Sequence, residues 1–229
     1  MTQTRKSIFK GPINDDTAYF LPMAAFLLLT YAAAHWPSFA ALGYIIKTVL
    51  AGCLLVLLSR HYTKINWSYA WLGVIIGVIG VFQWVGMEKI LLHFWPHYWR
   101  PSAEVVDPFK QDLPPVLLWT FIAVRLIGPV LVVPFMEEYF WRDFLWRMII
   151  APNDFKLAAI GEWDWKAFII VTLAFASVHI QWITAIVWGA MIAALLIRTK
   201  SLGPCIIAHA ITNLLLGIYV LITHDWAFW

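Results

Sequence analysis

Hydrophobic positions along this chain form long, mostly apolar runs rather than an alternating pattern. They cover residues 19–36, 41–59, 69–94, 116–127, 130–147, 166–181, 182–198 and 203–222. A helix needs about 20 apolar residues to cross roughly 30 Å of hydrocarbon. The pattern predicts an all-α polytopic transmembrane bundle of about seven to eight spans. A polar arm at 1–18 precedes a single transmembrane domain at 19–229.

Two places in this pattern are ambiguous. The run at 116–127 ends at Gly128-Pro129, which favours a helix break. We interpret this run as an interfacial or partly inserted helix, or as an extra span. The runs at 166–181 and 182–198 have almost no connection and are only marginally long enough to cross. One of them is therefore predicted to be short or broken.

Composition supports the membrane assignment. Hydrophobic residues make up 62% of the chain and charged residues 13%, which excludes a soluble domain with a large core. A formal net charge of +3 is too small to indicate a nucleic-acid partner. Cys53 and Cys205 both lie in apolar runs and are predicted to be buried free thiols.

The distribution of basic residues predicts the orientation, because Lys and Arg concentrate in cytoplasmic segments. With the N-terminus inside, the outer segments hold only Arg100 and Lys110. The inner set is Arg5, Lys6, Lys10, Arg60, Lys64, Arg142, Arg147, Lys156, Lys166, Arg198 and Lys200. We expect a bacterial inner-membrane protein with a cytoplasmic N-terminus. Lys47 is read as interfacial, and Arg125 is expected to extend toward the outer interface.

Two adjacent carboxylates and an arginine interrupt the run at 130–147. Ionisable groups at this depth cost about 2.5–3.5 kcal/mol each, so they usually face the protein interior and serve a function. Glu138 and Arg142 are four residues apart with the acid first, which favours an ion pair on one helix face. Glu137 lies about 100° away on an α-helix and must therefore face something else.

Three further polar residues lie within the last spans: His179, His209 and Asn213. Depth can be estimated from the basic residues that mark the cytoplasmic ends, at about 1.5 Å per helical residue. This places Glu137 and His209 roughly 13–15 Å deep, and His179 and Asn213 roughly 20 Å deep. The four side chains are therefore expected to converge near the middle of the bilayer.

These motifs together resemble the three-motif signature of the CPBP family. The motifs are Glu137-Glu138-x-x-x-Arg142, Phe175-x-x-x-His179 and His209-x-x-x-Asn213, within a core at 116–222. The family comprises CAAX-protease and bacteriocin-processing (Abi) intramembrane endopeptidases. Asp143 departs from the glycine that many members carry after the arginine, and it leaves the exit of this helix open. The tryptophan content resembles a branch associated with exosortase and PEP-CTERM systems.

The resemblance implies a glutamic-type endopeptidase with a conical intramembrane cavity and no cofactor. Its water would be activated by Glu137 and His179, and its oxyanion would be bound by His209 and Asn213. Glu138, Arg142 and Phe175 would support the site. The implied partners are a membrane protein or peptide substrate and the lipid bilayer.

The chemistry is also reasonable from the residues alone. Amide hydrolysis needs a water, a base that activates it and donors for the developing oxyanion. Neutral His209 and the Asn213 amide can both donate hydrogen bonds. A water-accessible cleft from the cytoplasmic side is expected, because it would let polar groups persist at this depth.

Two other functions fit the same residues. Glu137, His179 and His209 are a chemically reasonable zinc set with water as the fourth ligand, although no His-Glu-x-x-His pair is present. A non-catalytic scaffold or immunity protein would use the polar cluster only for binding. A transporter would be expected to show inverted repeats, and none is evident in the sequence.

Overall fold

The computed structural model describes residues 13–36, 39–101 and 107–228, and all regular elements in these ranges are helical. The helices are α1 (Asp15–His35), α2 (Ala40–Leu57), α3 (Ala70–Phe94), α4 (Pro115–Leu131), α5 (Val133–Glu137), the π-helix η4 (Glu138–Leu145), α6 (Trp146–Ile150), α7 (Trp165–Ser177), α8 (Trp182–Thr199) and α9 (Leu202–Thr223). Short 3₁₀ turns lie at Ser59–His61, Pro108–Lys110, Phe155–Leu157 and Trp226–Phe228. Within these ranges, six helical segments are long and apolar enough to cross a membrane, and α7 is a shorter apolar helix. The predicted polytopic helical bundle is confirmed.

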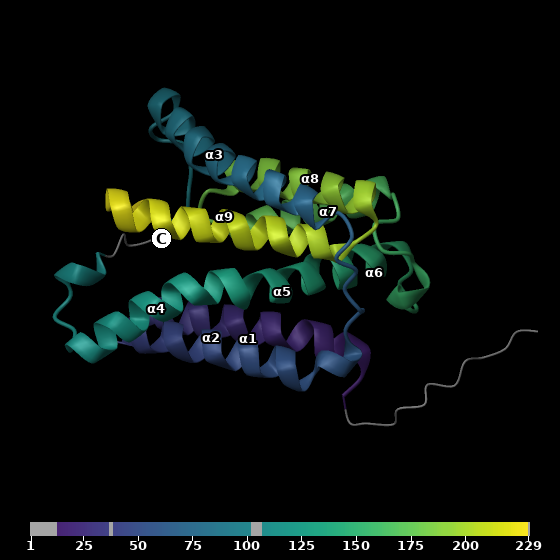
Figure 1. Ribbon diagram of the computed structural model, residues 1–229, viewed down its shortest axis with the longest axis horizontal. Coiled ribbons are helices and arrows are strands. Elements are labelled where there is room, and N and C mark those ends of the chain that lie inside the picture. Colours follow the sequence, from purple (N-terminus) through teal and green to yellow (C-terminus); the bar gives the residue numbers. More distant parts are fainter. Residues whose placement is uncertain (1–12, 37–38, 102–106, 229) are drawn as a thin grey trace, which may run out of the picture.

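The bundle has two groups of helices on either side of one long run (Figure 1). Helices α1 and α2 pack against each other on one side, and α3, α8 and α9 form the other side. The run from α4 to α6 passes between them and contacts both α2 and α9. The middle of this run therefore lies between the two groups.

Glycines allow α3 and α9 to approach closely. A Cβ built on Gly77 would lie 2.8 Å from the carbonyl oxygen of Ala208 in α9. A Cβ on Gly80 would lie 2.5 Å from Thr212 Oγ1 and 2.3 Å from Trp188 Cζ3. Small residues at such positions are the usual means of close helix packing in membranes. They bring the first half of α9, with Thr212, against α3.

The expected break at Gly128-Pro129 is wrong, because α4 continues through both residues to Leu131. Residues 115–150 form one apolar helical run of 36 residues, interrupted only by a turn at Val132. Gly128 serves as a contact point instead. A Cβ there would lie 2.5 Å from Thr48 Cγ2 of α2, so the glycine permits the crossing of α2 and α4.

The prediction of a short or broken helix among the last spans is confirmed. Helix α7 has 13 residues and ends at Ser177, and α8 begins at Trp182. The backbone N–H of His179 donates to the Ala176 carbonyl at 3.0 Å in the turn between them. His179 therefore projects from irregular backbone rather than from a helix.

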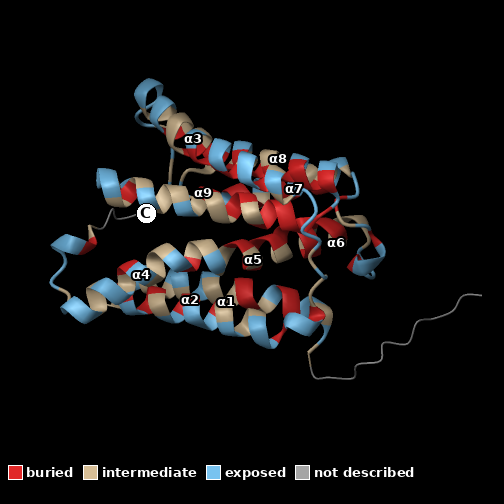
Figure 2. Ribbon diagram, viewed as in Figure 1, coloured by how far each residue is buried: buried red, intermediate tan, exposed pale blue. Residues whose placement is uncertain are grey.

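The two ends of the bundle differ in packing (Figure 2). We call one end of the bundle the closed end; it holds the segments that join α2 to α3, α6 to α7 and α8 to α9. The opposite end, which holds the end of α1, the 95–101 segment and residues 224–228, is the open end. Buried residues gather toward the closed end around α6 and the start of α9.

Asp143 and Arg147 anchor the closed end. Asp143 is fully buried, accepts a hydrogen bond from the Tyr19 hydroxyl at 2.8 Å and forms an ion pair with Arg147. Arg147 Nε also donates to the Ala158 carbonyl at 2.8 Å. The helix therefore does not end near Asp143 but continues to Ile150. Of the predicted inner basic residues, Arg5, Lys6 and Lys10 lie outside the described residues.

Candidate active site

The structure brings the four predicted residues together. Glu137, His179, His209 and Asn213 all line one cavity of about 330 Å³ between the two helix groups. Glu137 comes from the end of α5, His179 from the turn after α7, and the other two from α9. The convergence predicted from depth alone is present in the fold.

Glu137 is the last residue before the helix widens. It is 8% exposed, and its Oε2 atom is buried without a hydrogen-bond partner among the described residues. The π-helix begins at the next residue, Glu138. Such wide turns within α-helices occur frequently at functional sites. The sequence interpretation assumed regular α-geometry here, and nothing in the motif signalled the change.

Glu138 is fully buried and serves two partners. Its Oε1 accepts from Arg142 Nη1 at 3.2 Å and from His209 Nδ1 at 2.9 Å. The predicted ion pair is therefore present. The bond to His209 was not anticipated, because it joins residues 71 positions apart.

This bond determines which nitrogen of His209 carries hydrogen. A carboxylate only accepts, so Nδ1 must be the donor. In a neutral ring Nε2 then has no hydrogen and cannot donate to an oxyanion. His209 can donate from Nε2 only as an imidazolium, and the Glu138 carboxylate is placed to balance that charge. An oxyanion contact through Nε2 would thus need the charged ring, and the role of His209 stays a prediction.

His179 is fixed in a comparable way. Its Nδ1 lies 2.7 Å from the Phe175 carbonyl oxygen, so Nδ1 carries the hydrogen and Nε2 is the free acceptor of a neutral ring. The rings of Phe175 and His179 are 4.4 Å apart between centroids. The Phe175 ring also contacts the Arg142 guanidinium, whose Cζ lies 4.5 Å from the ring centroid. Phe175 thus links the two motifs by packing.

Asn213 joins α9 to α4. Its Nδ2 donates to the Pro129 carbonyl at 2.7 Å. An amide nitrogen has two hydrogens, so one donor is engaged between the helices and one remains for the cavity. Asn213 thus acts as interhelical contact and keeps the capacity for a second hydrogen bond.

Comparison with known families agrees with this geometry. Residues 118–215 match the Rce1-like family of type II CAAX prenyl endopeptidases. The matched stretch contains all three motifs and every residue of the site described so far. The resemblance to the CPBP family is confirmed over this stretch. The Rce1-like match indicates an integral membrane protein and suggests intramembrane endopeptidase activity. The narrower link to exosortase and PEP-CTERM systems stays a prediction. Searches of curated proteins and of solved structures give no match.

Two cations outside the Rce1-like motifs also line the cavity, Lys47 of α2 and Arg125 of α4. Lys47 is 7% exposed and donates from Nζ to Thr30 Oγ1 at 2.8 Å. Its expected interfacial position is therefore wrong. Arg125 lies with its Cζ 4.5 Å from the Tyr44 ring centroid, beside the cavity rather than directed only to the membrane surface. Their mid-run positions could have indicated this, since intramembrane cations usually face the interior.

Glu88 was missed by the sequence interpretation. It is 1% exposed and accepts from the Tyr98 hydroxyl at 2.7 Å, Arg100 Nη1 at 3.1 Å and Thr184 Oγ1 at 2.9 Å. Burial, together with the adjacent Glu88 carboxylate, raises the pKa of Tyr98 above its usual range. This network joins α3 to α8 and to the 95–101 segment, and Glu88 does not line the cavity.

The cavity extends toward the open end. Its lining continues to Thr30 near the end of α1, to Gln181 and to Phe228. Gln181 Nε2 also donates to the Ala227 carbonyl at 3.0 Å. The cavity therefore extends away from the closed end, and the expectation that it opens to the cytoplasm stays a prediction.

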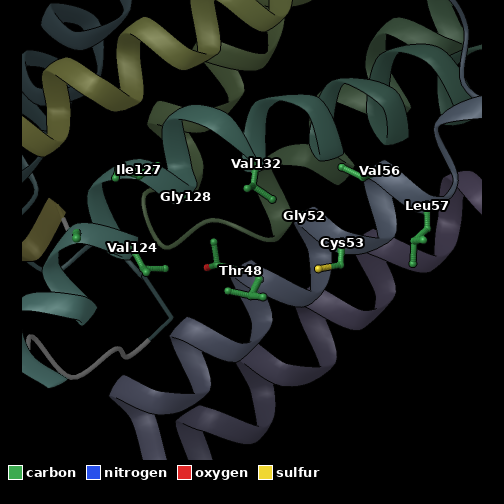
Figure 3. Close-up of a pocket in the computed structure, with 11 residues that line it drawn as sticks. Thr48, Gly52, Cys53, Val56, Leu57, Val124, Ile127, Gly128 and Val132 are labelled. Carbon is green, nitrogen blue, oxygen red and sulfur yellow. The ribbon is translucent and has the colours of Figure 1, made fainter. Parts of the chain in front are cut away.

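A larger hollow of about 590 Å³ lies between α2 and α4 (Figure 3). Its lining includes Cys53, Gly128 and Val132 and contains no ionisable side chain apart from the Cys53 thiol. Cys53 is exposed, in contrast to its predicted burial, whereas Cys205 is buried as predicted. None of the motif residues contributes to this hollow.

Proposed function

We propose that this protein is an intramembrane endopeptidase that hydrolyses peptide bonds of membrane-associated proteins or peptides with a water activated by Glu137 and His179. The observation that carries this proposal is the single cavity lined by Glu137, His179, His209 and Asn213. A buried carboxylate oxygen without a partner, beside an imidazole with a free acceptor nitrogen, is suited to bind and deprotonate water.

In the proposed reaction, Glu137 accepts a proton from a water that His179 Nε2 helps to orient. The water oxygen bonds to the carbonyl carbon of the substrate, and the carbonyl electrons move to oxygen. The His209 imidazolium and the remaining amide hydrogen of Asn213 stabilise this oxyanion. The C–N bond then breaks as Glu137 returns its proton to the leaving amine, which gives a carboxylic acid and an amine.

Glu138 and Arg142 have positioning roles in this scheme. Glu138 holds His209 through Nδ1 and balances the charge that the ring must carry to donate from Nε2. Arg142 forms an ion pair with Glu138 and packs over the Phe175 ring. Neither residue contacts the reacting atoms.

The orientation follows from the basic residues. We propose that the N-terminus lies in the cytoplasm of a bacterial inner membrane, because Lys64, Lys156 and Lys200 lie in the three segments that define the closed end. The cavity then extends toward the outer side, so substrates reach the site from the outer half of the bilayer.

The test is cleavage of membrane peptides by the protein reconstituted in liposomes, with products identified by mass spectrometry. Glu137→Gln retains size and polarity but removes the base, so we expect cleavage to fall about 10²–10⁴-fold with an unchanged melting temperature. Glu162→Gln is the matched control, because Glu162 lies exposed on the segment before α7. Cleavage by Glu137→Gln at the wild-type rate would overturn the proposed role.

We further propose that hydrolysis needs no bound metal. Among the described residues, no three His, Cys, Asp or Glu side chains are grouped so that they could hold a metal ion, so the zinc alternative lacks geometric support. Activity should survive dialysis against a strong chelator. One equivalent of zinc per chain, lost together with activity in His179→Ala, would favour the zinc hydrolase instead.

A further inference from the structure

His179 lies in the short turn between α7 and α8, and the position of this turn depends on the helices around it. Helix α7 ends at Ser177 and α8 begins at Trp182. Two hydrogen bonds of His179 reach back to α7: its backbone N–H donates to Ala176, and its Nδ1 lies 2.7 Å from the Phe175 carbonyl oxygen. The other end of the turn leads into α8. The place of the imidazole in the cavity therefore also depends on how the first turn of α8 is held.

Helix α3 holds the first turn of α8 through Thr184. Thr184 is fully buried, and its hydroxyl donates to Glu88 Oε2 at 2.9 Å. The Thr184 carbonyl oxygen accepts from Gln83 Nε2 at 3.2 Å. From the same helix, the Trp84 ring lies 5.7 Å from the His179 ring, between centroids, in a T-shaped arrangement. A short stretch of α3 therefore contacts both the start of α8 and the imidazole in the turn before it.

The Glu88 carboxylate is also held through its other oxygen. Glu88 is 1% exposed, and its Oε1 accepts from the Tyr98 hydroxyl at 2.7 Å and from Arg100 Nη1 at 3.1 Å. A hydrogen bond to a charged group is roughly twice as strong as one between neutral groups. The bond from Thr184 to Glu88 is therefore a firm link between α3 and the first turn of α8.

We propose that Glu88 is a positioning residue for His179 and acts through Thr184. This inference rests on the proposed peptidase function, in which His179 Nε2 orients the water. Gln181, the residue before α8, makes no capping hydrogen bond with its side chain, so the start of α8 relies on contacts with other helices. Glu88 supplies such a contact, although it lies outside the cavity lining. With this bond in place, the turn keeps His179 beside Trp84 and at the cavity.

The first test compares Thr184→Val with Tyr98→Phe. Each variant removes one hydroxyl that donates to Glu88, but only Thr184→Val breaks the link to α8. In Tyr98→Phe, the Oε1 atom keeps its bond to Arg100. The measurement is the rate at which diethyl pyrocarbonate modifies the His179 ring in detergent, followed by mass spectrometry. Thr184→Val should raise this rate about tenfold, the factor that loss of one hydrogen bond to a charged group allows, and Tyr98→Phe should leave it unchanged.

A double-mutant comparison tests whether Glu88 acts through Thr184. Glu88→Leu removes the carboxylate and the link together, so adding Thr184→Val to it should not raise the His179 modification rate further. Glu88→Gln can still donate from its amide to Thr184 Oγ1, so it should keep the rate near that of the wild type. The His209 ring in the same samples is the internal reference, because its Nδ1 is held by Glu138.

Equal His179 rates in Thr184→Val and Tyr98→Phe would overturn the proposal, whether both rise or neither does, because Glu88 would then only stabilise the fold. Additive effects of Glu88→Leu and Thr184→Val would also overturn it. Melting temperatures are measured beside the rates, so that all variants are compared as folded proteins. The comparison of Thr184→Val with Tyr98→Phe decides the question even if Glu88→Leu does not fold.

A second test follows cleavage of membrane peptides by the same variants, which separates this inference from the peptidase proposal. Thr184→Val should lower kcat about tenfold with an unchanged KM, because Thr184 lies outside the cavity lining. Tyr98→Phe should keep both constants. A His179 rate that depends on Thr184 in a protein that cleaves no peptide would retain the link from Glu88 to His179 and overturn the peptidase. Cleavage by Thr184→Val at the wild-type kcat would retain the peptidase and overturn the positioning role.

Discussion

The closed and open ends of this bundle treat their charges differently. At the closed end, Asp143 is paired with both Tyr19 and Arg147, and Lys156 donates to Asp15 at 2.6 Å. In the cavity toward the open end, a carboxylate oxygen of Glu137 has no partner among the described residues, and Lys47 has no carboxylate partner there either. Paired charges hold the helices together, whereas incompletely paired charges surround the cavity.

This difference teaches how a membrane protein can keep a polar site without losing its fold. Removing one member of a buried ion pair costs about 3–5 kcal/mol because the other member is left uncompensated. The pairs at the closed end make that region stable. The cavity can then keep groups that are ready to bind water and substrate, at some cost in stability.

The largest contrast between the two ends is their side of the membrane. In a background with Cys53 and Cys205 replaced by serine, single cysteines at Lys64 and Asn153 should react only with a reagent that reaches the cytoplasm. A cysteine at Lys110 should react only from outside, since all three positions are exposed. The measurement is labelling of intact cells with an impermeant maleimide. Labelling of Lys110 and Asn153 from one side would show that the two ends do not face opposite compartments.

The next largest effect is expected for Glu138→Gln, which tests whether the Glu138 carboxylate stabilises the fold or takes part directly in catalysis. Glu138→Gln leaves Arg142 buried without its charge partner, so we expect a loss of about 3–5 kcal/mol in the free energy of unfolding. Activity should also fall, because His209 loses the group that stabilises its charged form. Thermal melting in detergent beside cleavage rates measures both. If Glu138→Gln were stable but inactive and Glu137→Gln fully active, the catalytic role would belong to Glu138 and not to Glu137.

A smaller effect concerns the packing that brings α9 to the site. Gly80→Ala places a methyl group against Trp188 and Thr212, so it should destabilise the fold by about 3 kcal/mol through overpacking. The control is Gly86→Ala in the same helix, where a Cβ meets nothing within 4 Å. That variant should be neutral or more stable by about 0.5–1 kcal/mol. Equal melting temperatures for the two variants would contradict the close α3–α9 approach.

The smallest effect is confined to the closed end. Tyr19→Phe removes the hydroxyl that donates to Asp143 and accepts from the Thr63 backbone N–H at 2.7 Å. The expected loss is about 1.5 kcal/mol, typical of a hydrogen bond to a charged group. Cleavage per folded molecule should not change, because Tyr19 does not line the cavity. A large loss of turnover at unchanged stability would show that the two ends are coupled.

The sequence was sufficient for the outline of the site. Runs of apolar residues reveal spans because the hydrocarbon thickness fixes their length, and rare polar residues within them reveal the interior. Depth counted from the basic residues was enough to place Glu137 and His209 in one layer. The Glu138–Arg142 pair was predictable because it depends only on local helix geometry.

Other features depend on contacts between distant segments and carried no local signal. The bond from His209 to Glu138, which decides which nitrogen can face the cavity, joins two separate helices. The close contact of Gly128 in α4 depends on the position of Thr48 in α2. The direction of the cavity depends on which end packs more tightly, and no motif encodes that.

The short helix α7 has a consequence for the surrounding lipid. Thirteen residues rise about 20 Å, which is roughly 10 Å less than the hydrocarbon thickness. Ile169, Ile170 and Leu173 of α7 are exposed and would face acyl chains, while Trp182 Nε1 donates to the Trp99 carbonyl at 2.9 Å just beyond its end. Hydrophobic mismatch of this kind thins the adjacent bilayer. On this flank, lipid headgroups and their hydration water would be drawn down toward His179, so in the proposed reaction the substrate peptide bond need not cross a full leaflet.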